Sequence, residues 1–176
     1  MALGNQVKTE PLSTTYTYEA YPLGSTFLQH ASDVAVEAGN SGVSTTVSFG
    51  LLQGDREWVF VYAKELISAG FLCEWDFDHG IAYSIEPATT TDQIIQTLAG
   101  VADNAIAAGS YGWICKKGTV VVWAHGDVAG VGEPLASQGA DGQVDDDGAA
   151  GTCLGMSLEA EGGTLASYAQ AYINIP

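Results

Sequence analysis

The run from Gly109 to Ala124 constrains the fold more than any other part of the sequence. Its first half pairs aromatic residues with glycines, and the stretch from Thr119 to Ala124 consists almost entirely of β-branched and aromatic residues. Such residues suit a pleated, half-buried strand. Because Lys117-Gly118 is a turn dipeptide, the pattern predicts a β-hairpin in the middle of a β domain. We expect the short apolar runs downstream, cut by Gly, Asp and Ser, to supply its partners.

Two other segments predict long strands. Trp58 to Ala63 carries large side chains on both faces, which indicates a central strand covered on both sides. Residues 165–175 alternate with period two, and the face with Tyr168, Gln170, Tyr172 and Asn174 is the wetter one. Shorter strands are predicted at residues 70–75, 82–85, 127–135 and 151–158.

The sequence also contains a loose internal repeat of about 60 residues, the kind of period that marks repeated structural units. Both copies have a strand, a polar turn, an apolar residue, a glycine and a short strand. The first copy is Val61-Tyr62-Ala63, Ile67, Gly70 and Leu72, and the second is Val122-Trp123-Ala124, Val128, Gly132 and Leu135. Two copies of such a β motif could pack as the halves of a sandwich or barrel.

One segment is ambiguous. Residues 91–107 have apolar side chains near helical spacing behind a cap at Thr91 or Asp92. Gly100 makes a short helix followed by a strand over 100–107 equally consistent with the pattern. The predicted fold is therefore mostly β, a β-sandwich or small β-barrel with at most one short helix near residues 92–99.

The N-terminal residues differ in composition from the rest. Residues 1–26 are rich in Thr and Tyr, and Pro11 and Pro22 oppose helix. We interpret them as an extended arm, and residues 27–176 as a single β domain. The arm has too few aliphatic residues for a core of its own, so it lies either on its own sheet or on another subunit. Its expected contact residues are Leu12, Tyr16, Tyr18 and Tyr21, since Tyr buries a large area and keeps a polar end.

Charge restricts the partners. The chain has 5 Lys and Arg against 21 Asp and Glu, a formal net charge of −16. Such a field repels phosphate backbones and anionic lipid, so we expect neither nucleic acid nor membrane as a partner. No apolar run is long enough to span a bilayer, and the N-terminus lacks the features of a secretory signal. Cys73, Cys115 and Cys153 are widely spaced in apolar runs, which predicts buried, reduced thiols and no disulfide or zinc site.

One acidic cluster could bind a hard cation. Asp141, Asp145 and Asp147 lie on a Gly-rich stretch, and several carboxylates on such a turn can surround Ca²⁺. The cluster lacks the spacing of an EF-hand and its distal Glu, so a solvated acidic loop is the simpler interpretation. No cofactor is expected.

Two groups could carry catalysis. Glu74 with His79 offers a carboxylate and a histidine in one acidic turn, and Cys153 lies in a Gly-rich run. The turn is more simply a solvated loop between strands, and the apolar neighbours of Cys153 favour an inert buried thiol. The sequence has no nucleophile elbow, phosphate-binding loop or dinucleotide fingerprint. We therefore expect a protein without enzymatic activity.

Several short motifs together resemble the capsid decoration, or cement, proteins of tailed bacteriophages. They are residues 105–114, Gly118 with the β run after it, residues 129–135, residues 139–144 and Cys153-Leu154-Gly155, together with Trp58–Ala63 and residues 67–70. The resemblance covers about residues 54–175. It implies a small β domain that binds the outside of an assembled head, often as a trimer, without catalytic residues. Residues 1–48 are not covered.

The resulting hypothesis is a structural virion protein on the capsid exterior, assembled in the host cytoplasm. It would be a homotrimeric cement protein whose partner is the major capsid protein. The alternative is a ligand-binding or glycan-binding head fibre or minor capsid module, with Ca²⁺ at the acidic cluster. A glycan site would expose Trp75 or Trp113 in a shallow groove, whereas a cement protein would bury its aromatic residues.

Overall fold

A computed structural model of the chain describes residues 14–29, 55–89, 94–125, 130–138, 142–146, 153–158 and 167–176. The predicted mostly β fold is confirmed, because the only helix among these residues is a single 3-10 turn, Ile95–Thr97. The strands are β1 (Thr26–Gln29), β2 (Arg56–Ala63), β3 (Leu72–Trp75), β4 (Ser84–Pro87), β5 (Leu98–Val101), β6 (Ser110–Ala124), β7 (Pro134–Ser137), β8 (Val144–Asp145), β9 (Gly155–Ser157) and β10 (Ser167–Asn174). None of the helices in the described part is long and apolar enough to cross a membrane.

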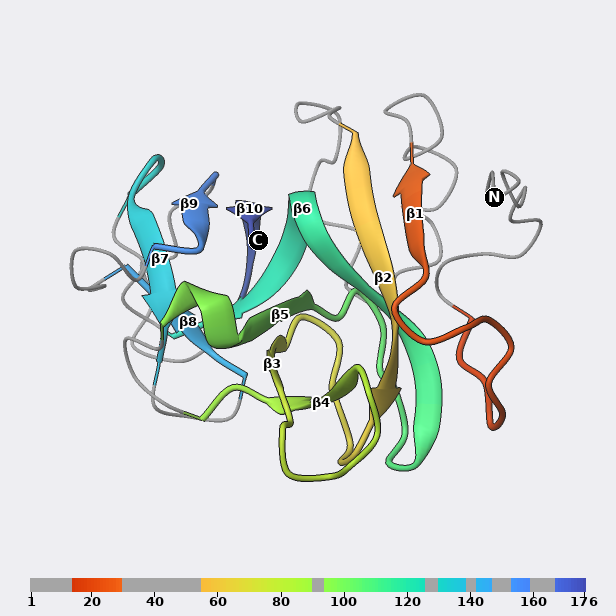
Figure 1. Cartoon of the computed structure of the whole chain (residues 1–176). Helices are drawn as coiled ribbons and strands as arrows, with labels where there is room; N and C mark the ends of the chain where they lie inside the picture. The colour runs from red at the N-terminus through yellow and green to blue at the C-terminus, as the bar shows by residue number, and fades with distance from the viewer. Residues whose placement is uncertain are drawn as a thin grey trace.

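Strand β6 belongs to two closed rings of strands. Its first half pairs with β2, and the order β2-β4-β3-β5-β6 closes a five-stranded ring, the first barrel. Its second half pairs with β10, and the order β6-β10-β9-β7-β8 closes another, the second barrel. Figure 1 shows β6 passing from the group around β2 to the group around β7, β9 and β10. The predicted small barrel is therefore confirmed in a doubled form, with one strand common to both rings.

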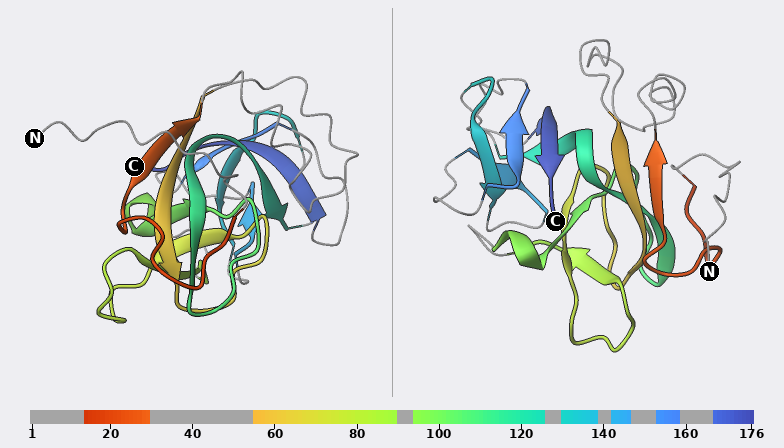
Figure 2. Two further views of the ribbon diagram at one scale, coloured as in Figure 1. Left: turned by 90° about the vertical axis from the view of Figure 1, so that its right-hand side faces the viewer. Right: turned by 45° about the horizontal axis from the view of Figure 1, so that its top comes forward.

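The predicted hairpin within residues 109–124 is wrong. β6 runs without reversal for 15 residues, and its pairing with β2 shifts register between Glu57 and Trp58, which oppose Lys117 and Cys115 and leave Lys116 as the extra residue of a bulge. Gly118 has a φ of 113°, and a Cβ there would lie 2.8 Å from the carbonyl oxygen of Asp55. A bulge bends a strand and increases its twist. β6 thus bends as it passes from the first barrel into the second, and Figure 2 shows the curved strand.

The two barrels have the same strand pairings in the same register. Every contact between neighbouring strands of the first ring has a counterpart in the second. The equivalent pairs, first barrel before second, are Ala63–Ser110 and Ala124–Ser167, Ala63–Ile85 and Ala124–Val144, Trp75–Ile85 and Ser137–Val144, Cys73–Gly100 and Leu135–Gly155, and Val101–Cys115 and Met156–Tyr172. The chain is built from two copies of one unit that share β6.

Details of the backbone repeat as well. The turn before β3 and the turn before β7 each contain a glycine in the left-handed region, Gly70 with a φ of 80° and Gly132 with a φ of 87°. The Gly70 N–H donates to the Ala102 carbonyl at 2.7 Å, and the Gly132 N–H donates to the Ser157 carbonyl at 2.8 Å. The sequence repeat is confirmed in this turn. At the next strand the alignment of the two copies is wrong by one residue, because Leu135 corresponds to Cys73 and not to Leu72.

Each unit also needs a glycine where its fourth strand meets the next long strand. A Cβ on Gly100 would lie 2.5 Å from the Cys115 carbonyl oxygen, and a Cβ on Gly155 would collide with the Tyr172 carbonyl oxygen. Real Cβ atoms do not approach backbone this closely, so both positions require the absence of a side chain.

The core is divided in the same way as the strands. One cluster of buried apolar residues comes only from β2 to β6 and their connections, and fills the first barrel: Val59, Val61, Ala63, Ile67, Cys73, Ile85, Ala99, Ala102, Ile106 and Ile114. The other fills the second barrel and extends over the outside of the first, where Trp58, Phe60 and Trp113 lie. Both faces of β2 are therefore buried, as its sequence predicts.

Two sequence expectations need correction. The ambiguous segment forms neither a helix nor a strand over 100–107 in its described part, but the 3-10 turn and then β5. On β10, Ala169, Ala171 and Ile173 are buried as predicted, yet Gln170 on the face expected to be wet is only 3% exposed. Gln170 faces Val121 of β6 in the sheet, at the position that Trp113 has in the first barrel.

Candidate binding site in the loop between β3 and β4

A hollow of about 430 Å³ opens in the loop that joins β3 to β4. It is lined by Trp75, Asp76, Phe77, Gly80, Ile81, Ala82, Tyr83 and Ser84. Its lining is mainly apolar at the rim and polar at the base. The hollow belongs to the first barrel, at the end where β2 and β4 run parallel.

Aromatic rings form the walls. The rings of Trp75 and Tyr83 meet nearly at a right angle, with centroids 5.7 Å apart and an interplanar angle of 76°. Phe77 is 76% exposed, more than any other large apolar residue in the described part of the chain. An exposed Phe beside a half-open aromatic corner is an arrangement found at interaction surfaces.

Tyr83 is held in an unusual conformation. Its φ is 58°, and it is the only non-glycine residue with positive φ among those described. Its ring lies over Gly24, where a Cβ would overlap the ring itself. The Tyr83 carbonyl accepts a hydrogen bond from the Tyr62 N–H at 3.1 Å. Left-handed backbone at a bulky residue is strained, and such strain persists where surrounding structure imposes it.

The base of the hollow is organised by Asp76, whose side chain is 2% exposed. Its carboxylate accepts hydrogen bonds from the Asp78 N–H at 3.0 Å and the Ser84 hydroxyl at 3.2 Å. Lys64 Nζ and His79 Nδ1 lie 3.7 and 3.9 Å from its oxygens. Burial alone would raise the pKa of Asp76, but the Asp78 N–H, Lys64 and the other partners outweigh it and lower the pKa. Asp76 is therefore ionised and fixes the loop.

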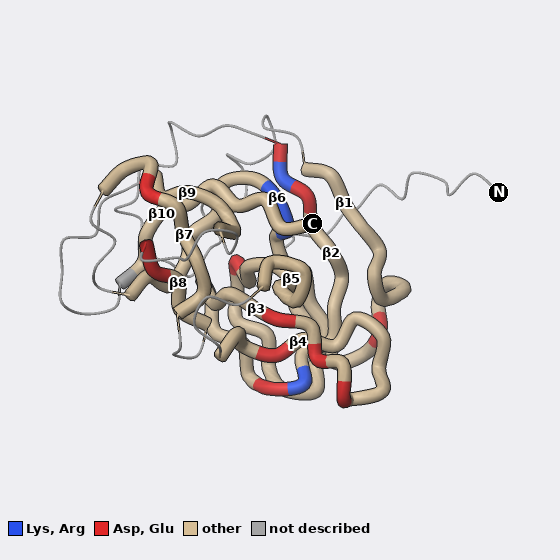
Figure 3. The backbone as a smooth tube through the Cα atoms, turned by 60° about the vertical axis from the view of Figure 1, so that its left-hand side comes forward, with Lys and Arg blue, Asp and Glu red and all other residues tan. Residues whose placement is uncertain are grey.

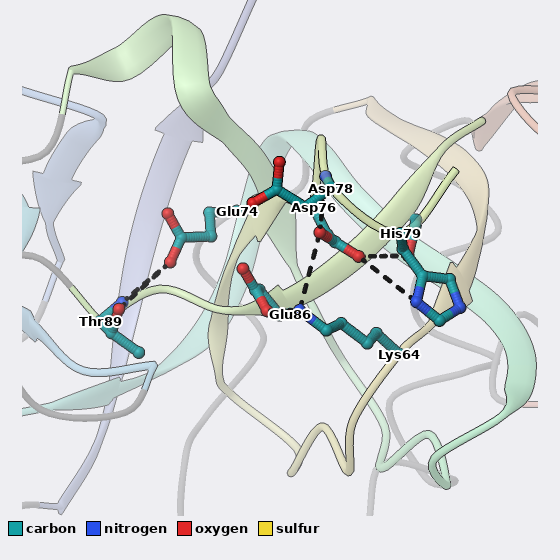
Figure 4. A network of polar contacts seen from close by, with 8 residues as sticks. Lys64, Glu74, Asp76, Asp78, His79, Glu86 and Thr89 are labelled. Carbon is teal, nitrogen blue, oxygen red and sulfur yellow. Dashed lines mark hydrogen bonds and ion pairs between the residues drawn. The ribbon is translucent and has the colours of Figure 1, made fainter. Parts of the chain in front are cut away.

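Lys64 links this base to the neighbouring strand. Its ammonium group donates to Glu86 at 2.7 Å, and this hydrogen bond raises the pKa of Lys64. Glu74 accepts from both the N–H and the hydroxyl of Thr89, at 3.2 and 3.4 Å. Figure 4 shows His79 and Glu74 at opposite ends of the network. The structure therefore does not bring Glu74 and His79 together as an acid–base pair.

The second barrel has a smaller version of this network. His125 corresponds to Lys64, because the two make equivalent backbone hydrogen bonds. The His125 N–H donates to the Val144 carbonyl at 2.7 Å, and the Lys64 N–H donates to the Ile85 carbonyl at 3.0 Å. Asp145 corresponds to Glu86 and lies 3.5 Å from His125 Nδ1. Gln138 occupies the position of Asp76 and donates to Asp145 at 2.6 Å.

The acidic cluster of the sequence is only partly described. Asp145 is buried and bound to Gln138, and its other carboxylate oxygen accepts from the Asp146 N–H at 2.7 Å. Asp141 and Asp147 lie outside the described residues, so the calcium site stays a prediction. In the part of the chain that the structure describes, no three His, Cys, Asp or Glu side chains gather in a way that could hold a metal ion.

The arm residues are placed in part. Tyr16 is 7% exposed and pairs through its backbone with Tyr111, with both hydrogen bonds at 2.8 Å. The rings of Tyr16 and Tyr21 pack edge-on against Phe60 at 5.8 and 5.3 Å. Tyr18 is 66% exposed. Residues 14–25 thus cover the outside of the first barrel of their own chain, while Leu12 lies outside the described residues and the contact role of the four stays a prediction.

The thiols and tryptophans complete the account of the predicted residues. Cys73 and Cys115 are buried, and burial raises the pKa of both thiols, that of Cys115 to about 12. The expectation of a buried Cys153 is wrong, because its side chain is exposed while its neighbour Leu154 is buried. Trp113 is buried, but Trp75 lines the hollow beside polar groups.

Sequence reasoning treated residues 74–79 as a solvated turn and missed Lys64, Phe77 and Tyr83 as parts of one site. Phe77 carried a signal, since a large apolar residue between two aspartates is unusual in a turn. Lys64 and Tyr83 carried none, because they meet only through the parallel pairing of β2 with β4.

Neither a protein-family model nor a curated protein matches the sequence. Among solved structures, the chain is similar to the N base of the head fibre gp8.5 in bacteriophage phi29, with a TM-score of 0.51 and 20% sequence identity. The match covers 66% of this chain and 92% of that chain. At this identity the likeness shows a shared fold.

Proposed function

We propose that the chain is a non-enzymatic structural protein of a phage head, bound to the outside of the capsid. The observation that carries the proposal is the likeness of its fold to the base of a phage head fibre, which accounts for nearly all of that base. The net charge of −16 supports an outward position, away from packaged DNA. The sequence motifs shared with decoration proteins support a cement role, in which the protein stabilises the shell through contacts with the major capsid protein, as a homotrimer.

The arm is the proposed capsid contact, through Leu12, Tyr18 and the outer side of Tyr21. Tyr18 is the best candidate among the described residues, because 66% of it is available to a partner. Tyr16 is better suited to anchoring the arm on the first barrel, since it is buried against Phe60.

Co-sedimentation with empty shells assembled from the major capsid protein of the same phage tests this function. The full-length protein should pellet with shells, and Tyr18→Ser should weaken binding while leaving the melting temperature close to that of the wild type. Deleting the arm would be a poor test, because the loss of Tyr16 and Tyr21 would uncover Phe60. Failure of the wild-type protein to bind shells at any concentration tested would refute the proposal.

A second candidate is the attachment base of a head fibre, favoured by what the similar solved structure is. The two functions differ in their effect on the shell. A cement protein should raise the temperature at which the shell disrupts, whereas a fibre base should bind without changing it.

A further inference from the structure

The loop that forms the hollow is specific to the first of the two equivalent units. Between the equivalent pairs Trp75–Ile85 and Ser137–Val144, the first unit has the nine residues 76–84 and the second has the six residues 138–143. The hydrogen bond that closes the base of each loop is the same, from Asp76 N–H to Ser84 at 2.9 Å and from Gln138 N–H to Gln143 at 3.0 Å. The additional residues therefore extend outward from a common base.

Those outward residues include the aromatic ones. Phe77 and Tyr83 lie in the enlarged loop, and Trp75 occupies a position where the second unit has Ser137. Ring closure does not require the enlarged loop, since the second unit has fewer residues between the equivalent pairs. Trp75 also packs against the core and Tyr83 covers Gly24, but packing does not account for Phe77, which is 76% exposed.

The surroundings of the hollow are strongly acidic. Figure 3 shows acidic residues gathered around β3 and β4 with one basic residue among them. The carboxylates are Glu65, Glu74, Asp76, Asp78 and Glu86, and the basic residue is Lys64. Lys64 is already bound to Glu86 and close to Asp76, so these carboxylates leave a local excess of negative charge.

Perpendicular aromatic faces beside carboxylates attract a cation. The faces of Trp and Tyr carry negative partial charge, and a Lys ammonium or Arg guanidinium group placed over them is stabilised, more so when it is partly desolvated. A hollow of about 430 Å³ has room for such a side chain. We propose that the corner formed by Trp75, Phe77 and Tyr83 binds a lysine or arginine side chain that projects from the protein partner of this chain.

That the partner is the capsid subunit rests on the proposed function. That the ligand is a cationic side chain does not rest on it. Two measurements separate the claims. The first uses isotope-labelled full-length protein and the probes acetyl-arginine amide and acetyl-lysine methylamide, with acetyl-norleucine amide and methyl glucoside as uncharged comparators. The second is co-sedimentation with shells.

In the first measurement, the two cationic probes should shift the resonance of the Trp75 indole N–H and those of the loop amides, and both comparators should leave them unchanged. Phe77→Leu and Tyr83→Leu keep apolar bulk but remove an aromatic face, and each should weaken probe binding by about tenfold. Phe77 is so exposed that its replacement should not affect folding. Tyr168→Leu, which alters another Trp–Tyr corner at Trp123, is the matched control and should bind as the wild type does.

Equal shifts by acetyl-norleucine amide would overturn the proposal in favour of a plain apolar site, and binding of methyl glucoside alone would overturn it in favour of a glycan site. In the second measurement, Phe77→Leu should weaken shell binding and Tyr168→Leu should not. If the wild type binds shells and Phe77→Leu binds equally well, the proposed function survives and this inference fails. If the cationic probes bind and shells do not, the ligand chemistry stands and the proposed function fails.

Discussion

The two barrels are one design carried out twice with different polar groups. In the first, Lys64 faces two carboxylates, Asp76 and Glu86, whereas the second has His125, Gln138 and Asp145 at the equivalent positions. The apolar core and the backbone pairings tolerate either set. The comparison teaches that the barrel is specified by its strands and glycines, and that the charged groups at its mouth serve the loop they support.

The largest effect expected from this comparison concerns the paired glycines. Gly100→Ala and Gly155→Ala each place a methyl group against a backbone carbonyl that cannot move without separating two strands. We expect each to destabilise the whole chain by about 4 kcal/mol or more, or to prevent folding. Thermal unfolding would measure this as a fall of at least about 8 °C.

Gly132→Ala is the control for this pair. It has a φ of 87° but open space around it, so only the backbone cost of about 1–2 kcal/mol is expected. If Gly155→Ala had the same melting temperature as Gly132→Ala, the close approach of β9 to β10 would not be what requires a glycine at position 155.

The next effect tests whether the barrels unfold together. Ile85→Ala and Val144→Ala remove equivalent fully buried side chains from the first and second barrel. Ile85→Ala should cost about 2–5 kcal/mol, and Val144→Ala less because fewer carbons are removed. Since β6 is common to both cores, hydrogen exchange should show protection falling in β2 and β10 alike in either variant. Loss of protection confined to the altered barrel would contradict this, and Leu66→Ala at an exposed site should change nothing.

A smaller effect separates the two polar networks. Asp76→Asn makes the first network neutral at the position where the second has Gln138, and it should cost about 1–3 kcal/mol at pH 7. The pKa of Asp76 is lowered in the folded chain, so its ionised form adds stability above the unfolded value of about 4, and this is lost as pH falls through the lowered native value. Urea unfolding at pH 7, 5 and 3 should therefore show the gap between wild type and variant closing only at the acid end. Asp78→Asn keeps its backbone N–H, and a gap as large as that of Asp76→Asn would count against this account.

The smallest effect distinguishes the thiols. Cys73 belongs to the core of the first barrel, Cys115 belongs to the other core cluster, and Cys153 is exposed. A thiol reagent should modify one cysteine in the native chain and all three after unfolding, because burial raises the pKa of the other two thiols. Modification should barely change the melting temperature. Cys153→Ser should abolish the native reaction, and a second reactive thiol would show that one of the two cores opens readily.

Local pattern predicted the long strands well, whereas the strand predicted at 127–135 begins only at Pro134 in the described residues. Trp58–Ala63 was recognisable from its large side chains on both faces, and residues 167–174 from their alternation. Both properties can be read from consecutive residues. The repeat was visible for the same reason, since Ala63 and Ala124 end strands of the same kind before a turn glycine. The choice between sandwich and barrel could not be made, because ring closure depends on β2 meeting β6 and β6 meeting β8.

What failed were the features that depend on distant neighbours. Lys117-Gly118 has turn chemistry, but other strands pair with β6 on both sides of it, so the chain continues through a bulge at Lys116 and a positive φ at Gly118 instead of reversing. Cys153 precedes its strand by two residues and so faces solvent despite its apolar neighbours. The candidate site was predictable only in part. Its loop residues are adjacent in sequence, whereas Lys64 and Gly24 come close to them only in the folded chain.

The shared strand also reduces the number of strands that each additional barrel would need. Two separate five-stranded rings would need ten strands, whereas here nine suffice and β1 is added to one edge. A third ring would need only four new strands, because β10, if extended from 8 residues to the 15 of β6, would be shared by the second and third rings. Lengthening one strand past a bulge is thus the step that turns a closed, finite barrel into a unit of a linear series.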